Sequence, residues 1–110
     1  MSADKVEIAM LCDIYGALLS EKEREALVNY YDDDLSLAEI AENTGISRQG
    51  VRYQIKFAES KLAEYEEKLG LLAKRRLAEK DLAALREAVG SDEKAIALVE
   101  TLSAHLFSEE

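Results

Sequence analysis

The segment 37–55 constrains the fold of this chain more than any other part of the sequence. Gly45 stands near its middle, where a tight turn between two helices needs a positive φ that glycine adopts at no steric cost. Apolar residues stand at the spacings with which two crossing helices close their joint: Ile40, Ala41, Ile46, Val51 and Ile55. Few other short structures require this combination, so the segment predicts a helix-turn-helix and makes binding the first function to test.

Pairs of serine and glutamate mark where helices begin. Ser36 is followed three residues later by Glu39, the spacing of a capping box, and Ser47 is placed to cap the helix after the turn. Ser20 and Glu23 repeat the box earlier in the chain. The sequence has no proline, and its five glycines are isolated, so only glycines and capping residues interrupt the helices. We therefore predict an all-α fold.

The predicted helices cover most of the chain. Their ranges are about 4–18, 20–31, 37–43, 47–70 and 71–90, with a last helix opened by Ser91. In the first helix we expect one apolar side: Val6, Ala9, Met10, Ile14, Ala17 and Leu18. After Ser47 the apolar residues follow steps of four and three: Val51, Ile55, Ala58, Leu62, Tyr65 and Leu69. This seam predicts that the second helix of the motif continues as one rod to Gly70.

Residues 71–110 carry two further apolar stripes, which are Leu71, Ala78, Leu82, Leu85 and Val89, then Ala95, Val99, Leu102 and Leu106. Either the stripes cover one another within the chain, or they pair with a second copy, and a short domain with an extended rod favours a homodimer. We predict a helix-turn-helix domain over 1–70 and a helical pair over 71–110 for packing or dimerisation. If the seam were instead a protein-interaction surface, Leu62→Asp would break an assembly.

Charge is unevenly distributed along the chain. Its 14 basic and 23 acidic residues give a formal net charge of −9, which disfavours nonspecific binding to nucleic acid. From Ser47 to Lys61, four bases stand against the single acid Glu59, so this segment is locally +3. The side chains it would present to a nucleic acid or another partner are Ser47, Arg48, Gln49, Arg52, Tyr53 and Lys56. Arginine can pair with guanine and glutamine with adenine, while lysine reaches the phosphate backbone.

Two alternatives remain open for these basic residues. Arg48, Arg52 and Lys56 are spaced by four, which is also typical of a solvated helix stripe or of a protein-docking face. A second basic cluster, residues 74–76 with Lys80, is ordinary surface unless it faces the same way as the first. In that case the two clusters together would suit an irregular RNA or an acidic protein.

Signatures of catalysis and of cofactor binding are absent from the sequence. It has no phosphate-binding glycine loop, no HExxH and no serine or cysteine beside a usable histidine, so we expect no catalytic residue and no cofactor. Cys12 is expected to be a small buried residue and His105 a surface one. The aspartates 32–34 lack the spacing of a calcium loop and predict a solvated turn rather than a metal site. A polar N-terminus and no bilayer-length apolar run indicate a cytoplasmic protein without membrane insertion.

Several segments within residues 5–70 resemble one protein family. They are Leu19-Ser20-Glu21-Lys22, Tyr30-Tyr31, 33–42, Ser47-Arg48-Gln49, Val51, Ile55-Lys56 and 65–69. They resemble the YlxM family of small bacterial helix-turn-helix proteins and, more loosely, region 4 of sigma factors, in which the second helix of the motif reads DNA. Members of the YlxM family tend to have alanine and then Tyr-Asp near the start of that helix. This chain has Gly50 and then Arg52-Tyr53, a more basic face.

The resemblance implies a tri-helical unit like that of sigma region 4, here with a long C-terminal helical extension. It also implies a protein encoded beside the GTPase of the signal recognition particle and its receptor. A role in that targeting pathway follows as an expectation, with the particle's RNA or its GTPase as the partner. The alternative function is a transcriptional regulator that reads a sequence in duplex DNA.

Overall fold

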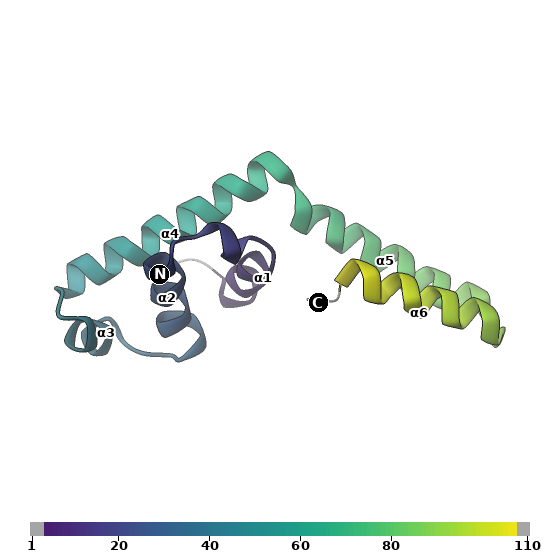
Figure 1. The fold of residues 1–110 in the computed structure, drawn as a ribbon, viewed down its shortest axis with the longest axis horizontal. Helices are drawn as coiled ribbons and strands as arrows, with labels where there is room; N and C mark the ends of the chain where they lie inside the picture. The colour runs from purple at the N-terminus through teal and green to yellow at the C-terminus, as the bar shows by residue number, and fades with distance from the viewer. Residues whose placement is uncertain (1–3, 108–110) are drawn as a thin grey trace. The chain divides into compact units, whose positions relative to one another are not determined.

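The structure, a computed structural model, describes residues 4–107, and these form six α-helices and no strand (Figure 1). The helices are α1 Lys5–Tyr15, α2 Glu21–Leu27, α3 Leu37–Thr44, α4 Arg48–Leu69, α5 Leu71–Val89 and α6 Glu93–Phe107. The predicted all-α fold is therefore confirmed. The chain divides into two compact units, residues 1–70 and 71–110. None of the helices between residues 4 and 107 has the length and apolar character needed to cross a membrane.

The core of the first unit is built on one face of α4, where four residues are completely buried: Val51, Ile55, Ala58 and Leu62. Helices α1, α2 and α3 pack against α4, as Figure 1 shows. Their buried side chains include Ile8, Leu11, Tyr15, Ala26, Leu27 and Ile40. The predicted seam is thus filled within the chain as far as Leu62. Leu62→Asp would place a charge in this core and unfold the unit. The variant therefore cannot test whether the seam is a protein-interaction surface, as the sequence suggested.

The buried face of α1 differs from the expected one. Val6 and Leu18 are 62% and 55% exposed. The residues that point into the core are instead Ile8, Leu11 and Tyr15. Apolar residues occur on several sides of this segment, so periodicity alone fits more than one face. Tyr15 fixes the rotation, because its hydroxyl donates to Glu66 Oε1 at 2.6 Å and its ring centroid lies 5.9 Å from that of Tyr65, both on α4.

Both predicted capping boxes are present. At the start of α2 the Ser20 hydroxyl accepts from the Glu23 N–H at 3.2 Å, and the Glu23 carboxylate accepts from the Ser20 N–H at 2.7 Å. Ser36 and Glu39 form the same pair at the start of α3. Helix α2 passes directly into a π-helical turn, Val28–Asp32, so the helical backbone reaches slightly beyond its expected end.

The joint of the helix-turn-helix has the predicted turn and one looser position. Gly45 has a φ of 78°, and its N–H donates to the Ala41 carbonyl at 2.9 Å, which closes α3. Ile40 is 2% exposed and Val51 is completely buried. Ile46, which was expected to close the joint, is 38% exposed because it lines an open recess of about 160 Å³ between α2, α3 and α4.

The second unit is a hairpin in which α5 and α6 lie side by side (Figure 1). Gly90, with a φ of 59°, lies in the turn between them. Asp92 caps α6 by accepting a backbone N–H at 3.1 Å, which corrects the expectation that Ser91 would open this helix. Leu82 of α5 and Val99 of α6 are buried. Four members of the predicted stripes are 42% to 52% exposed: Leu71, Leu85, Leu102 and Leu106.

Candidate nucleic-acid interface

Ser47 fixes the first turn of α4. Its hydroxyl oxygen accepts the Gly50 N–H at 3.0 Å, which satisfies one of the donors that a helix N-terminus leaves open. Gly50 fits closely at this place, because a Cβ there would lie 3.2 Å from the Ser47 hydroxyl oxygen. The oxygen of Ser47, a predicted binding residue, is therefore used by the cap, and α4 presents Arg48 and Gln49 in its first turn.

The other predicted binding residues all lie on exposed positions of α4, and they are Arg48, Gln49, Arg52, Tyr53 and Lys56. Tyr53 is 68% exposed. Successive residues of an α-helix are rotated by about 100° around its axis. Tyr53 is therefore rotated by about 200° from the buried Val51 and lies on the side opposite the core. One helix thus brings these side chains together on its surface. Their part in binding stays a prediction.

Three cations of this surface form a row along α4, with one cation per helical turn. Arg48, Arg52 and Lys56, here called the cationic row, have no ion pair within residues 4–107. Elsewhere basic side chains do pair with carboxylates: Lys5 with the exposed Asp34, Lys61 with Glu23, Lys68 with Glu64 and Arg86 with Glu100, at 2.7 to 3.0 Å. Because no carboxylate between residues 4 and 107 pairs with it, the cationic row keeps its attraction for an anionic ligand.

Lys56 shares an open recess with three acidic residues. It lines an open recess of about 540 Å³ between α1 and α4, together with Asp4, Glu7 and Glu59. The Glu59 carboxylate accepts from the Tyr31 hydroxyl at 2.5 Å, and burial followed by this hydrogen bond raises the pKa of Tyr31. The neighbouring carboxylates lower the local positive potential, so we expect Lys56 to bind phosphate less strongly than the two arginines.

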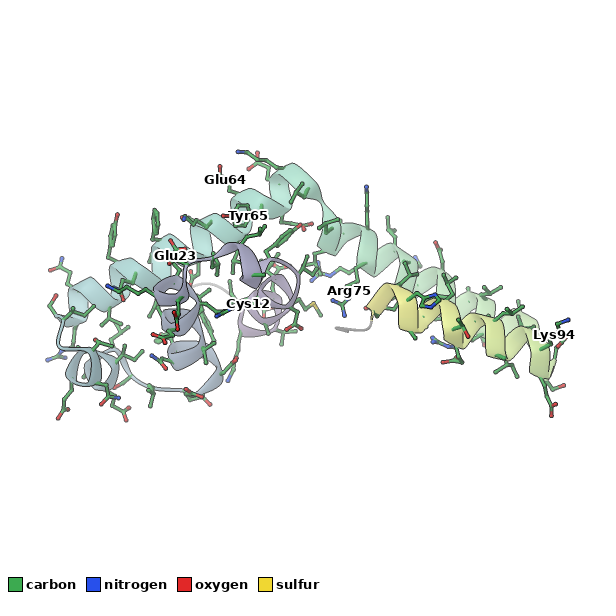
Figure 2. All side chains as sticks on the ribbon, in the orientation of Figure 1. Cys12, Glu23, Glu64, Tyr65, Arg75 and Lys94 are labelled. Carbon is green, nitrogen blue, oxygen red and sulfur yellow. The ribbon has the colours of Figure 1, made fainter. Side chains whose placement is uncertain are left out.

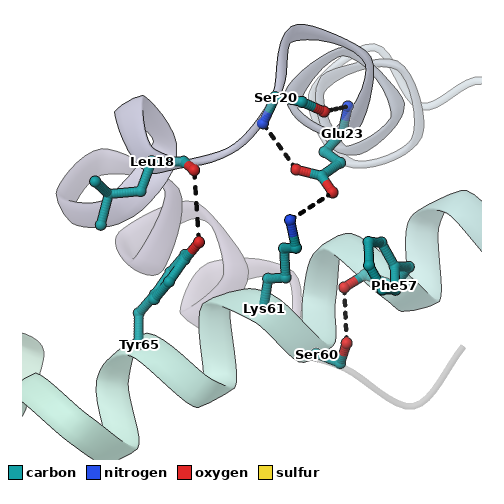
Figure 3. A network of polar contacts seen from close by, with 7 residues as sticks. All are labelled: Leu18, Ser20, Glu23, Phe57, Ser60, Lys61 and Tyr65. Atoms are coloured by element: carbon teal, nitrogen blue, oxygen red, sulfur yellow. Dashed lines mark hydrogen bonds and ion pairs between the residues drawn. The ribbon is translucent and has the colours of Figure 1, made fainter.

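Two residues of this surface were not predicted from the sequence. Phe57 is 43% exposed, and its ring lies parallel to that of Tyr53 within 9°, with the centroids 6.0 Å apart. Lys61 Nζ lies 5.1 Å from the Phe57 ring centroid and 3.0 Å from Glu23 Oε2 on α2 (Figure 3). The hydrogen bond from the Ser20 N–H, followed by that from Lys61, lowers the pKa of Glu23. Phe57 and Lys61 follow Tyr53 at intervals of four residues, and this spacing could have predicted from the sequence that they share its helix face.

The second basic cluster, residues 74–76, lies in the hairpin. Arg75, which is labelled on α5 in Figure 2, has its Nε 3.4 Å from Glu79 Oε1. Its guanidinium carbon lies 5.4 Å from the centroid of the Phe107 ring. Arg75 therefore interacts with a carboxylate and an aromatic ring of its own unit.

Cys12, labelled on α1 in Figure 2, is partly exposed. Burial, together with the nearby charges of Asp32 and Asp13, raises the pKa of its thiol to about 11. The thiol is protonated at neutral pH, whereas nucleophilic cysteines act as thiolates. His105 is exposed near the end of α6, as the sequence indicated.

A capped helix that follows a glycine turn and presents basic and amide side chains outward defines a helix-turn-helix protein. The chain belongs to the UPF0122 family, whose model, described as "Putative helix-turn-helix protein, YlxM / p13 like", matches residues 3–102. The resemblance to the YlxM family found in the sequence is therefore confirmed. Membership of this class suggests nucleic-acid binding, without specifying the nucleic acid.

Individual relatives agree with the family assignment. A UPF0122 protein of Clostridium botulinum is 55% identical over 71 residues, which are 64% of this chain and 65% of the relative. A relative from Halalkalibacterium halodurans is 48% identical over 95 residues, 84% of this chain and 87% of its own length. One from Clostridium kluyveri is 48% identical over 73 residues, 66% of each chain. The matched segment thus spans just under two thirds of the two clostridial relatives.

Proposed function

We propose that this protein is a non-enzymatic helix-turn-helix accessory protein of the signal recognition particle pathway that acts in the cytoplasm. In this proposal it binds the particle's RNA through the outer face of α4. The cationic row contacts phosphates, while Gln49 and Tyr53 contact bases. Membership of the YlxM-like family supports the pathway, and the exposed surface of α4 supports the mode of binding.

The observation that carries the proposal is a row of cations that has no ion pair within residues 4–107, on a chain of net charge −9. An acidic body repels polyanions, so attraction is confined to the part of the surface where positive charge is uncompensated. We favour the RNA over the GTPase because a nucleic-acid backbone carries one negative charge per nucleotide and can therefore engage several cations of the row at once.

The test measures binding of the full chain to the particle's RNA, to its GTPase and to the assembled particle over a range of salt concentrations. We expect Arg48→Gln/Arg52→Gln to lower the slope of log affinity against log salt by about 1.4, roughly 0.7 for each phosphate that the variant no longer neutralises. Lys22→Gln/Lys94→Gln removes the same charge from exposed positions outside α4 and should leave the slope unchanged. If none of the three is bound at low salt, the proposal is wrong, and binding to the GTPase alone would replace RNA as the ligand.

Duplex DNA is the alternative ligand, and the first turns of α4 favour it. Arg48, Gln49 and Arg52 are exposed where a recognition helix meets base edges in a major groove. If the protein reads DNA, removing the charge of either arginine costs about 1–3 kcal/mol of binding. Selection from random duplexes would then enrich one sequence, with half-sites about one helical turn apart for a dimer. A selected pool without enrichment would rule this alternative out.

We further propose that the protein forms a homodimer through the hairpin. The supporting observation is the exposure of Leu85, Leu102 and Leu106, which a second hairpin would cover in a four-helix bundle. Light scattering after size exclusion should give about twice the chain mass of 12.3 kDa. Leu102→Asp/Leu106→Asp should return the mass to that of one chain, and a monomeric wild type would contradict the proposal.

A further inference from the structure

An exposed aromatic pair lies on the outer face of α4. Tyr53 and Phe57 are 68% and 43% exposed, and their rings are parallel within 9°, with centroids 6.0 Å apart. The core of the unit needs neither ring, because other residues of α4 close it completely on the inner side. Two adjacent aromatic rings left in water are unlike the scattered single apolar residues of an ordinary surface, and a ligand would explain them.

Lys61 holds one end of this pair in place. Its ammonium nitrogen lies 5.1 Å from the centre of the Phe57 ring and 3.0 Å from the Glu23 carboxylate at the start of α2 (Figure 3). The Glu23 side chain is only 12% exposed and also closes the capping box of α2, so this anchor is part of the fold. The Phe57 ring is therefore positioned before a ligand arrives, which lowers the entropic cost of binding.

The same spacing continues on the other side of the pair. Gln49, Tyr53, Phe57 and Lys61 form one row along α4, here called the aromatic row, because residues four apart lie one above another. Each member of the cationic row precedes a member of the aromatic row by one position, so the two rows run side by side along the helix. One row offers flat ring faces and an amide, and the other offers positive charge without ion pairs within residues 4–107.

Resting on the function proposed above, we propose that the aromatic row binds unpaired bases of RNA. A base stacks on the ring of Tyr53, the Gln49 amide one turn earlier pairs with its edge, and the cationic row holds the phosphates on either side. In a duplex each base hides its faces against its neighbours, so exposed rings gain little from paired nucleic acid. The ligand class is therefore RNA with a loop, a bulge or a single-stranded segment.

The experiment compares three probes with the full chain by fluorescence anisotropy. They are an RNA hairpin with an unpaired adenine-rich loop, an RNA duplex in which the same adenines are paired, and the looped hairpin made of DNA. We expect the looped RNA to bind most tightly. Tyr53→Ala should weaken its binding about 5- to 150-fold, the range that stacking of one base on an aromatic ring supports, without changing the salt dependence.

Matched variants separate stacking from a general loss of structure. Tyr53→Phe keeps the ring and should bind the looped RNA like the wild type, and Leu98→Ala, at a position 65% exposed in the hairpin, should also be silent. A 2-aminopurine placed in the loop should change its fluorescence on binding to the wild type and to Tyr53→Phe. Binding of Tyr53→Ala should leave this signal unchanged, because the label would no longer stack on a ring.

Different failures lead to different conclusions. If Tyr53→Ala binds the looped RNA as tightly as the wild type while Arg48→Gln/Arg52→Gln still weakens binding, this inference is wrong and the proposed function stands. If the wild type binds the particle's RNA but not the looped hairpin, this inference is wrong and the proposed function stands. Equal binding of the DNA hairpin would overturn the assignment to RNA. A lower mass of Tyr53→Ala in light scattering would make the rings part of a protein interface instead.

Discussion

The inner and outer faces of α4 use the same stretch of chain in opposite ways. On the inner face an apolar residue recurs every third or fourth position, from Val51 to Leu62, and is completely buried. On the outer face the intervening positions carry the cationic row, which has no ion pair within residues 4–107, together with an amide and two exposed rings. The core needs only about one position per turn to be closed. Most residues of this helix are therefore free to serve binding without cost to the fold.

The two faces meet at one ion pair. Lys61 belongs to the outer aromatic row, yet its ammonium pairs with Glu23, which caps α2. Its side chain is 34% exposed and that of Glu23 only 12%. Stability and binding should therefore be hardest to separate near this pair and near Glu59, which accepts from the Tyr31 hydroxyl and lines the recess beside Lys56.

The largest effect is expected on the inner face. Leu62→Ala should lower the free energy of unfolding of the first unit by about 2–5 kcal/mol, because it leaves a cavity in a completely buried position. All five tyrosines lie within residues 1–70, so tyrosine fluorescence during urea unfolding reports on this unit alone. Gln49→Ala, at an exposed position on the outer face of the same helix, serves as the control and should change little. Equal effects of the two variants would contradict the contrast between the faces.

A smaller loss of stability is expected at the turn that starts α4. Gly45→Ala should cost about 1–2 kcal/mol, since a side chain at a φ of 78° is strained whatever the space around it. Gly16→Ala is the matched control, because Gly16 has an ordinary φ of −55° and nothing within 4 Å of the added Cβ. We expect that control to be stabilising by about 0.4–1 kcal/mol, and the same urea titration measures both. A neutral Gly45→Ala would mean that the turn relaxes without disturbing the inner face.

Much of the fold could be predicted from the sequence because its helices are punctuated locally. Ser20, Ser36 and Gly45 form hydrogen bonds with backbone groups no more than four residues away. Their capping roles can therefore be predicted from the residues next to them in the sequence. The all-α class followed from the same signals, together with the absence of proline. The exposed outer face of α4 also followed, because the helical period that buries Val51 and Ile55 turns the residues between them outward.

What the sequence could not decide depends on contacts between distant residues. The rotation of α1 is set by the bond from Tyr15 to Glu66, which lies 51 positions away, while the apolar residues around α1 leave several faces possible. The exposure of Ile46 depends on a recess bounded by three helices. Lys61 could be read as one base among several, because its partner Glu23 lies on another helix.

The pair that joins the two faces predicts a pH dependence. The folded chain holds the pKa of Glu23 below its usual range, so the charged form contributes stability that is present above about pH 4.5 and lost as the pH falls through the lowered pKa. Glu23→Gln should therefore cost less than about 1 kcal/mol at pH 7, and the difference from wild type should shrink towards pH 3. Urea titrations at the two pH values measure it. A difference that grows on acidification would contradict the assigned partners.

The smallest effect on stability, and the most direct test of the outer face, is expected within the cationic row. Lys56→Gln and Arg52→Gln should each change the free energy of unfolding by no more than about 0.5 kcal/mol, because both side chains are exposed and lack ion pairs within residues 4–107. We nevertheless expect Arg52→Gln to weaken RNA binding more than Lys56→Gln, since Lys56 lines a recess with Asp4, Glu7 and Glu59, whose negative charges oppose a phosphate there. Anisotropy titrations with one RNA probe at fixed salt rank the two variants. A larger loss of RNA affinity for Lys56→Gln than for Arg52→Gln would contradict this ranking. It would mean that the RNA backbone passes over the recess between α1 and α4, close to its acidic residues.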